Sequence, residues 1–358
     1  MSALPARPFS LQPGRHTTVF VAAGTNFAAS GNPLAVRGGH YDFHDKTALV
    51  TGGSRGLGFA IAEELAREGV RVVICARDEE RLERARVRLQ ARGDVRAIPC
   101  DVSDREQVER LVAAAGRVDI LVNNAGVISV GPLETQRLED FEQMHAIMFW
   151  GVVYPTFAVL PQMLARGEGR IANITSIGGK ISAPLLVPYN SAKFAAVGFS
   201  EGLRAELAGK GVRVTTVVPG LMRTGSYYAA LFKGRRELIY NLFSPLSATP
   251  LTTISGRRAA RKIVAAVGRG DPELILTVHA NVLTRLHGLA PGLSARVLGG
   301  VARLLPKGGT PDAVPGHEID SPLHDSALTA PGREAAKDLN QPLAPSSESP
   351  RAPRAGST

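Results

Sequence analysis

The chain has 358 residues, of which 44% are hydrophobic, so it is long enough for one large α/β core or two smaller domains. Its formal net charge is +10, but basic residues mostly alternate with acidic ones, as in residues 78–92, which indicates solvated helix faces. The eight His show no metal-binding spacing, and Cys75 and Cys100 fall in apolar runs typical of buried strands. The sequence therefore gives no support for a metal site or for a nucleic-acid-binding module.

Four regions follow one another along the chain. Residues 1–43 are rich in Pro, Gly and Ala, which predicts a flexible lead-in. Residues 44–280 alternate short β-branched runs with longer helical patterns, which predicts a single α/β domain with a doubly wound parallel sheet. Residues 281–307 are predicted to be an amphipathic helical extension. Residues 308–358 carry repeated Pro, Ser and acidic residues, which predicts a disordered tail, because little apolar surface is available to offset chain entropy.

The predicted elements alternate in chain order. The expected strands are residues 47–52, 71–76, 95–100, 118–124, 170–175, 212–220 and 273–278. The expected helices are residues 59–69, 79–92, 106–116, about 136–165 and about 188–208. Ligands in such open sheets bind at the carboxyl ends of the strands, so the residues that follow each strand are the candidates for a site. No signal sequence or membrane span is evident, and a cytoplasmic location is the default expectation.

A glycine-rich turn follows the first strand and opens the first helix. There the glycines permit close backbone approach to a pyrophosphate, and the helix N-terminus supplies free N–H groups. An ordinary turn is the alternative. The candidate dinucleotide-binding residues of this turn are Thr51, Gly52, Ser54, Arg55, Gly56, Leu57 and Gly58.

The end of the second strand distinguishes the two nicotinamide cofactors. An acidic residue there binds the ribose 2′-hydroxyl, whereas an Arg suits a 2′-phosphate. This chain has Arg77 at that place and Arg55 in the turn, and the guanidinium fork matches phosphate oxygens. We therefore expect NADP(H) rather than NADH, with solvated surface charges as the alternative interpretation.

Asp101 and Val102 follow the third strand, where the crevice of the sheet would hold the adenine. Asp101 also has a purely structural interpretation, as a residue ahead of the next helix. In that case Ser103 is the expected N-cap. The two roles are compatible.

Tyr189 and Lys193 stand four residues apart and project from one helix face. A phenol is a poor acid–base catalyst near neutrality, and a nearby ammonium lowers its pKa. Ser176 lies at the carboxyl end of a strand and can hydrogen-bond a substrate carbonyl, while a nicotinamide delivers hydride. These three residues are the expected catalytic groups.

With these motifs the chain resembles the short-chain dehydrogenase/reductase family over about residues 45–280. Further matching elements are Asn123–Gly126 and the Pro219–Thr224 segment. The resemblance implies a Rossmann-type sheet of seven strands and dimers or tetramers assembled through the two long helices. It also implies that Lys193 binds the nicotinamide ribose, that Asn123 supports the sheet, and that the Pro219–Thr224 segment contacts the carboxamide. The cofactor residues added in this way are Asn124, Ala125, Gly126, Pro219, Gly220 and Thr224.

Met148 departs from the family pattern, which commonly has Asn at this position to anchor a water that links the Lys to solvent. A thioether cannot make the hydrogen bonds of an amide. Three outcomes are open: another proton path, slower turnover, or a protein that binds NADP(H) as a sensor or scaffold without catalysis. The alternative is that the site tolerates Met.

The substrate side is predicted to lie in residues 226–252, which form a lid in the family. Their Tyr, Phe and Leu content favours an apolar carbonyl or secondary alcohol, such as a lipid, steroid-like or fatty-acyl compound, although a packed subunit interface is equally compatible. The basic amphipathic residues 281–307 favour either packing on the fold or peripheral contact with an anionic membrane.

Overall fold

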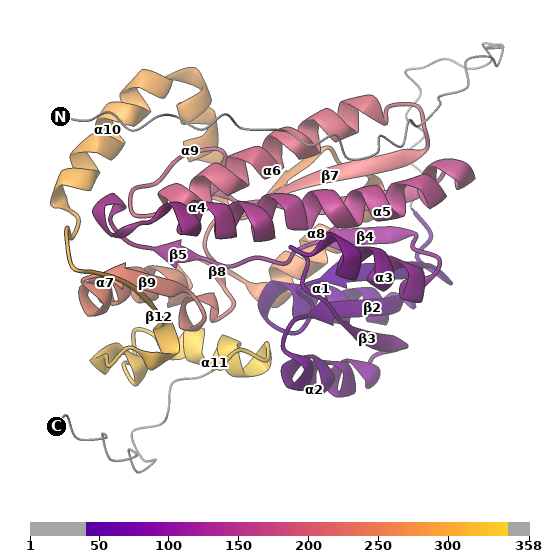
Figure 1. Ribbon diagram of the computed structural model, residues 1–358, viewed down its shortest axis with the longest axis horizontal. Helices are drawn as coiled ribbons and strands as arrows, with labels where there is room; N and C mark the ends of the chain where they lie inside the picture. Colours follow the sequence, from indigo (N-terminus) through magenta and orange to yellow (C-terminus); the bar gives the residue numbers. More distant parts are fainter. Residues whose placement is uncertain (1–40, 343–358) are drawn as a thin grey trace, which may run out of the picture. The chain divides into compact units, whose positions relative to one another are not determined.

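The structure is a computed structural model that describes residues 41–342 (Figure 1). Its main sheet has seven parallel strands in the order β11-β7-β6-β4-β1-β2-β3. The strands are β1 (Thr47–Thr51), β2 (Arg71–Ala76), β3 (Val95–Pro99), β4 (Ile120–Asn123), β6 (Gly169–Ile174), β7 (Val212–Val218) and β11 (Glu273–Ile275). The strand order reverses between β1 and β4, and this reversal opens a crevice at their carboxyl ends. The doubly wound Rossmann-type fold is thus as predicted.

Helices cover both faces of the sheet. One layer contains α1 (Gly56–Arg67), α2 (Glu79–Gln90) and α8 (Gly256–Arg269). The other contains α3 (Arg105–Ala115), α4 (Leu138–His145), α5 (Gly151–Arg166) and α6 (Val187–Glu206). Alternate residues of β1 point to opposite faces of the sheet. Ala48 and Val50 pack in the core on the side of α1, and Leu49 packs in the core on the side of α5. In Figure 1 the long helices α5 and α6 lie side by side on the near face of the sheet.

A π-helical turn, Ala146–Trp150, joins α4 to α5, so that Leu138–Arg166 is one continuous helix. Within residues 41–342 this helix alone is long and apolar enough to cross a membrane. It packs against the sheet and α6, and the core helices of globular domains pass the same test of length and composition. The π turn carries Met148, which is buried.

A smaller layer lies beside the main sheet. It contains a three-stranded sheet of β5 (Ser129–Val130), β9 (Leu231–Gly234) and β12 (Thr310–Pro315), with α7 (Arg236–Ala248) and α11 (Ala330–Asp338). A further pair, β8 (Met222–Arg223) and β10 (Ile254–Ser255), adjoins it. Its core holds the largest buried aromatic side chains of residues 226–252, which are Tyr227, Tyr228, Phe232 and Tyr240. These four side chains therefore fill a core and do not supply the apolar surface expected of a substrate lid.

The predicted disorder from residue 308 is wrong for residues 308–342. The strand β12 pairs antiparallel with β9, and Ile319, Ala336 and Leu339 are buried. The composition is polar, but the few apolar residues fall where the body of the fold already exposes apolar surface, so order comes from long-range contacts. Residues 343–358 lie outside the described part of the chain.

The predicted lead-in of residues 1–43 extends too far. Tyr41 and Phe43 are buried, and the Arg170 guanidinium lies 4.1 Å from the Tyr41 ring centroid. The rest of that segment, residues 1–40, lies outside the described residues. The domain therefore begins by residue 41.

The predicted extension consists of two helices, α9 (Val278–Leu289) and α10 (Pro291–Leu304). No residue of α10 is buried.

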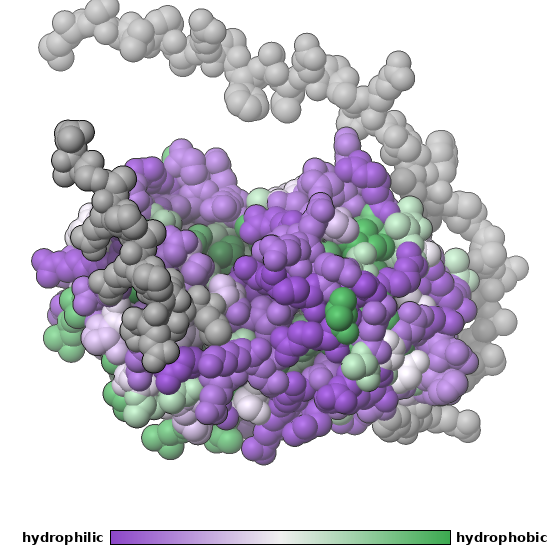
Figure 2. Space-filling view, turned by 90° about the horizontal axis from the view of Figure 1, so that it is seen from below, coloured by the Kyte–Doolittle hydropathy of each residue, from purple (hydrophilic) through white to green (hydrophobic). Residues whose placement is uncertain are grey.

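The face of the molecule seen in Figure 2 is mostly hydrophilic, with hydrophobic residues in small separate groups. This fits the alternation of basic and acidic residues along the sequence.

Candidate active site

The glycine-rich turn between β1 and α1 has the tight geometry expected of it. Gly52 and Gly56 have φ of +64° and +59°, a region that favours glycine. A side chain on Gly58 would lie 2.3 Å from the Gly52 carbonyl oxygen, so only glycine fits. The Thr51 hydroxyl accepts hydrogen bonds from the N–H groups of Asn124 (2.9 Å) and Ala125 (3.1 Å). Thr51 thereby ties the turn to the segment after β4.

One cavity of about 600 Å³ runs from this turn to the ends of β6 and α6. Of the residues predicted for the site, all but two line it: Gly52, Ser54, Arg55, Gly56, Leu57, Arg77, Asp101, Val102, Asn124, Ala125, Gly126, Ser176, Tyr189, Lys193, Pro219, Gly220 and Thr224. Thr51 and Gly58, predicted to bind cofactor, lie outside the cavity wall and support the turn. Residues that follow six strands, β1, β2, β3, β4, β6 and β7, thus meet at one edge of the sheet.

Three arginines gather at one end of the cavity. Arg55, Arg77 and Arg81 line it, and burial together with the charges of Arg81 and Arg77 lowers the pKa of Arg55 to about 10. Arg77 is 62% exposed, with its Nη1 3.8 Å from an Asp101 oxygen. Such a group of cations on a dinucleotide turn could hold a phosphate, because each guanidinium offers several donors.

Arg81 was not anticipated from the sequence. It lies in the first turn of α2, and its Nη1 is 3.2 Å from the carboxylate of Asp78, the N-cap of that helix. No signal in the sequence separates Arg81 from the other arginines of this highly charged helix.

Asp101 helps to shape the loop after β3. Its carboxylate accepts hydrogen bonds from the backbone N–H (3.0 Å) and the hydroxyl (2.7 Å) of Ser103. The prediction that Ser103 caps α3 is wrong. Asp104 caps α3 instead, accepting from the Gln107 N–H at 3.0 Å. A carboxylate is the stronger acceptor for the exposed N–H groups of a helix start.

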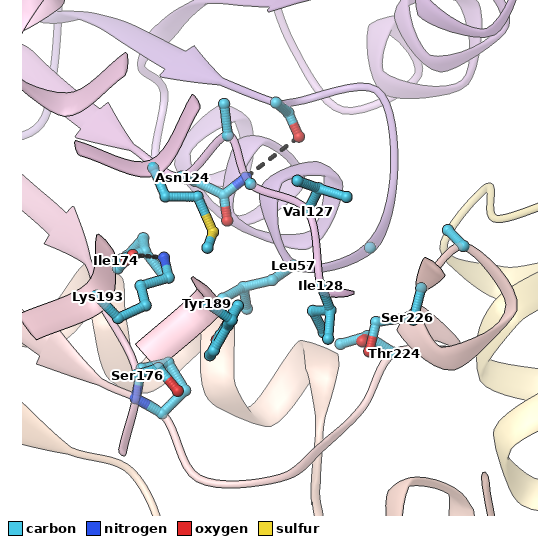
Figure 3. Close-up of a pocket in the computed structure, with 18 of the residues that line it drawn as sticks. Leu57, Asn124, Val127, Ile128, Ile174, Ser176, Tyr189, Lys193, Thr224 and Ser226 are labelled. Atoms are coloured by element: carbon cyan, nitrogen blue, oxygen red, sulfur yellow. Dashed lines mark hydrogen bonds between the residues drawn. The ribbon is translucent and has the colours of Figure 1, made fainter. Parts of the chain in front are cut away.

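The predicted catalytic residues meet at the other end of the cavity (Figure 3). Tyr189 and Lys193 lie on one face of α6, and Ser176 lies directly after β6. Lys193 donates a hydrogen bond to the Ile174 carbonyl at 2.9 Å, and its Nζ lies 6.0 Å from the Tyr189 ring centroid. Figure 3 shows these three side chains on one side of the pocket and Thr224 with Ser226 on the other.

The electrostatics of this group differ in part from expectation. Burial raises the pKa of Tyr189, and a hydrogen bond with Ser176 lowers it in opposition. Lys193 was expected to lower that pKa, yet in this structure the net direction is upward. Burial also lowers the pKa of Lys193 to about 8. The ammonium is therefore charged at neutral pH but within reach of titration.

Met148 lies close to Lys193. A side chain on Gly126 would lie 3.6 Å from the Met148 Sδ and 4.0 Å from the Lys193 Nζ, so both atoms flank the same point. The Met148 thioether at this point cannot hold a water by the hydrogen bonds that an amide would make.

The remainder of the wall is largely apolar and was not anticipated residue by residue. It includes Ile128, Ile181, Leu186, Met222, Phe243, Leu283 and Leu298. Phe243 alone among the aromatic residues of 226–252 reaches the cavity, from α7, while Leu283 and Leu298 come from α9 and α10. The sequence showed apolar content in these segments but not which side chains turn inward.

Comparison with known proteins gives a consistent result. The model of the short chain dehydrogenase family matches residues 46–230. Together with the fold and the cavity, this places the chain in that family of oxidoreductases.

Individual relatives cover most of the described domain. The chain is 34% identical over 275 residues to a Mycobacterium tuberculosis protein provisionally named as the oxidoreductase SadH, covering 74% of this chain and 98% of that one. A short chain dehydrogenase/reductase from Burkholderia phymatum, solved with NAD, is similar with a TM-score of 0.64 and 26% identity (71% of this chain, 96% of that one). A variant of the actinorhodin polyketide ketoreductase, solved with NADPH, has a TM-score of 0.58 and 32% identity (65% and 95%).

Proposed function

We propose that this protein is an NADP(H)-dependent oxidoreductase that interconverts a carbonyl and a secondary alcohol. The observation that carries the proposal is the single cavity that joins Ser176, Tyr189 and Lys193 at one end to the glycine turn and three arginines at the other. This arrangement suits a dinucleotide, because the glycine turn would hold the pyrophosphate at one end of the cavity and the nicotinamide would lie beside the reacting groups at the other. The small-molecule substrate then lies beside Tyr189.

Each residue of the reacting group has a role in this proposal. When bound, the reduced nicotinamide supplies hydride to the carbonyl carbon. The Ser176 hydroxyl orients the carbonyl oxygen, and the Tyr189 hydroxyl gives its proton to that oxygen. The Lys193 ammonium favours the phenolate that remains and holds the nicotinamide ribose.

The preference for NADP(H) over NADH rests on the positive charge of Arg55, Arg77 and Arg81, because only NADP(H) carries a 2′-phosphate for them to hold. Loss of one charge-assisted contact should weaken NADPH use by about tenfold or more. We expect Arg77→Ala and Arg81→Ala to lower kcat/KM for NADPH and to leave the value for NADH unchanged. The matched control is Arg84→Ala on the same helix, outside the cavity wall. Equal use of both cofactors by the unmodified protein would refute this part.

An apolar substrate is favoured by the cavity wall, to which Ile181, Leu186 and Phe243 contribute together with Tyr189. Pockets select largely through such surfaces. A lipid, steroid-like or fatty-acyl ketone is therefore the proposed class.

Peripheral contact with an anionic membrane is a further part of the proposal. Residues 278–307 contain four basic side chains, Arg285, Arg296, Arg303 and Lys307, and no acidic residue. Each helix has an exposed apolar stripe at spacings of four, four and three: Val278, Val282, Leu286 and Leu289 on α9, and Leu293, Val297, Val301 and Leu304 on α10. Apolar stripes with basic flanks suit the interface of an anionic bilayer. Because Leu283 and Leu298 line the cavity, a substrate could enter from that side.

We also propose a homo-oligomer, dimer or tetramer, assembled through α5 and α6. Phe157 on α5, Phe194 on α6 and Trp150 in the π turn that precedes α5 are exposed, and aromatic side chains are enriched in interfaces. Cytoplasmic location stays a prediction and is compatible with either association.

A second candidate is an NADP(H)-binding sensor or scaffold without turnover. Met148 favours it, because the thioether near Lys193 cannot anchor a water for a proton path as an amide would. This candidate keeps cofactor affinity and loses activity on every carbonyl substrate.

A further inference from the structure

The chain after α11 returns to the glycine-rich turn. We call Asp338–Gln341 the strap. Its Leu339 carbonyl accepts a hydrogen bond from the Gly56 N–H at 2.8 Å, one of the donors that a helix start leaves without an internal partner. The Asn340 side chain donates to the carbonyls of Ser54 (2.8 Å) and Arg81 (3.3 Å). The strap therefore contacts both the turn and α2, the two elements that carry Arg55 and Arg81.

Burial of Leu339 and hydrogen bonds of Asp338 hold the strap against the domain. Leu339 is 1% exposed and packs in the core shared by α1 and α8. The Asp338 carboxylate accepts two hydrogen bonds from Arg257, both 2.7 Å, and Arg257 in turn pairs with the buried Glu63. The Asp338 carbonyl also accepts from the Arg88 guanidinium at 2.6 Å. Such bidentate pairs fix geometry as well as charge.

Gln341 reaches the arginine of the turn. Its Oε1 accepts a hydrogen bond from the Arg55 Nη1 at 3.3 Å, and its side chain lines the cavity. A neutral amide orients a guanidinium without cancelling its charge, whereas a carboxylate would neutralise it. Arg55 thus stays oriented and keeps its positive charge for an anionic ligand, beside the cations of Arg77 and Arg81.

We propose that Gln341 is a positioning residue for the 2′-phosphate of NADP(H), and that this last residue of the strap forms part of the wall of that subsite. This inference rests on the proposed function, because it presupposes that the arginine cluster takes a 2′-phosphate. The chemical class recognised is an adenosine carrying a phosphomonoester on its ribose. The strap, which lies in the segment predicted to be disordered, thereby contributes to the discrimination between NADP(H) and NADH.

Isothermal titration of the full chain tests the proposal without requiring turnover. The two probes are adenosine 2′,5′-bisphosphate and AMP, which differ only in the 2′-phosphate. Gln341→Met keeps the side-chain volume and removes the acceptor. We expect it to raise the Kd for the bisphosphate roughly three- to tenfold, as for loss of a single hydrogen bond, and to leave the Kd for AMP unchanged.

Three further variants sharpen the result. Gln341→Glu should weaken the bisphosphate more than Gln341→Met does, because the new carboxylate pairs with Arg55 and repels the phosphate. Lys337→Gln is the matched control on the exposed side of α11, with no change expected. Arg55→Met removes the guanidinium itself and should reduce the preference for the bisphosphate more than Gln341→Met does.

The outcomes separate this inference from the proposed cofactor preference. If the unmodified protein and Arg55→Met behave as expected but Gln341→Met weakens both probes equally or neither, the role of Gln341 is overturned and the preference for NADP(H) stands. If the unmodified protein binds both probes equally, the cofactor preference fails and the role of Gln341 fails with it.

Discussion

Lys193 is buried and Tyr189 is partly buried, and the surroundings of both side chains disfavour their charged forms. Burial lowers the pKa of Lys193 to about 8 and raises the pKa of Tyr189. With a pKa of about 8, the Lys193 side chain is an ammonium below that pH and neutral above it. The residue that we propose to assist Tyr189 therefore changes its charge just above neutrality.

A pH profile follows from this titration. We expect kcat/KM for NADPH-dependent carbonyl reduction to be flat below about pH 8 and to fall above it, because deprotonation removes the charge that assists Tyr189. Lys193→Arg, which keeps the charge, should carry residual activity whose falling limb moves to higher pH. If kcat/KM falls at the same pH in the unmodified protein and in Lys193→Arg, the titrating group is not Lys193.

Met148 offers a second test at the residue scale. Met148→Asn places an amide beside Lys193, where it can hold a water, and we expect the reductase rate to rise roughly two- to tenfold, a small fraction of what acid–base groups contribute. Met148→Leu is the matched control, since it changes shape without adding a donor. A rate unchanged in the Asn variant, with a good substrate, would dismiss a limiting proton path.

Single residues differ in how far the sequence predicts them. Ser176, Tyr189 and Lys193 could be placed because their spacing and strand ends fix where they must lie. Arg81 and Gln341 could not, since an Arg on a charged helix and a Gln in a Pro-rich segment have no distinguishing pattern. Their roles depend on which distant element each one faces.

Among the elements, the strands and helices of the main sheet follow from alternation of β-branched runs and helical periodicity, because each pattern is local. The segment from Thr310 to Gln341 is different. It is held by pairing with β9, by the Arg257–Asp338 pair and by burial of Leu339. None of these contacts is visible in a composition that lacks periodicity.

The stability of this C-terminal segment can be measured directly. Leu339→Ala should lower the free energy of unfolding by about 2–5 kcal/mol, the range for a buried Leu, and should lower the thermal midpoint. Leu328→Ala is the matched control, because Leu328 is 59% exposed and should change stability little. Denaturant unfolding followed by circular dichroism gives both values; similar small effects for the two variants would mean that the segment is not folded onto the domain.

At the scale of the whole molecule, α9 and α10 form a basic surface with two apolar stripes next to the cavity. The family model ends at residue 230, so nothing in the shared motifs predicts this surface. Its amphipathic character could be read from the sequence, but the orientation of the stripes away from the fold could not.

Vesicle binding tests this surface. The full chain should sediment with vesicles that contain phosphatidylglycerol, bind pure phosphatidylcholine vesicles weakly, and dissociate as salt increases. The double variant Leu289→Glu with Leu304→Glu alters two highly exposed side chains and should abolish binding, whereas Leu251→Glu, 93% exposed outside these helices, should not. Loss of binding in the Leu251 variant as well would point to a nonspecific effect of charge.

The central claim is that Tyr189 transfers a proton during NADPH-dependent reduction of an apolar carbonyl compound. Its most direct test is the loss of NADPH absorbance with a panel of steroid-like, fatty-acyl and aromatic ketones, using the unmodified protein and Tyr189→Phe. We expect turnover by the unmodified protein and a decrease of about 10²- to 10⁴-fold in kcat for Tyr189→Phe, with NADPH affinity unchanged. NADPH binding without turnover of any ketone, or equal rates for the two proteins, would contradict it.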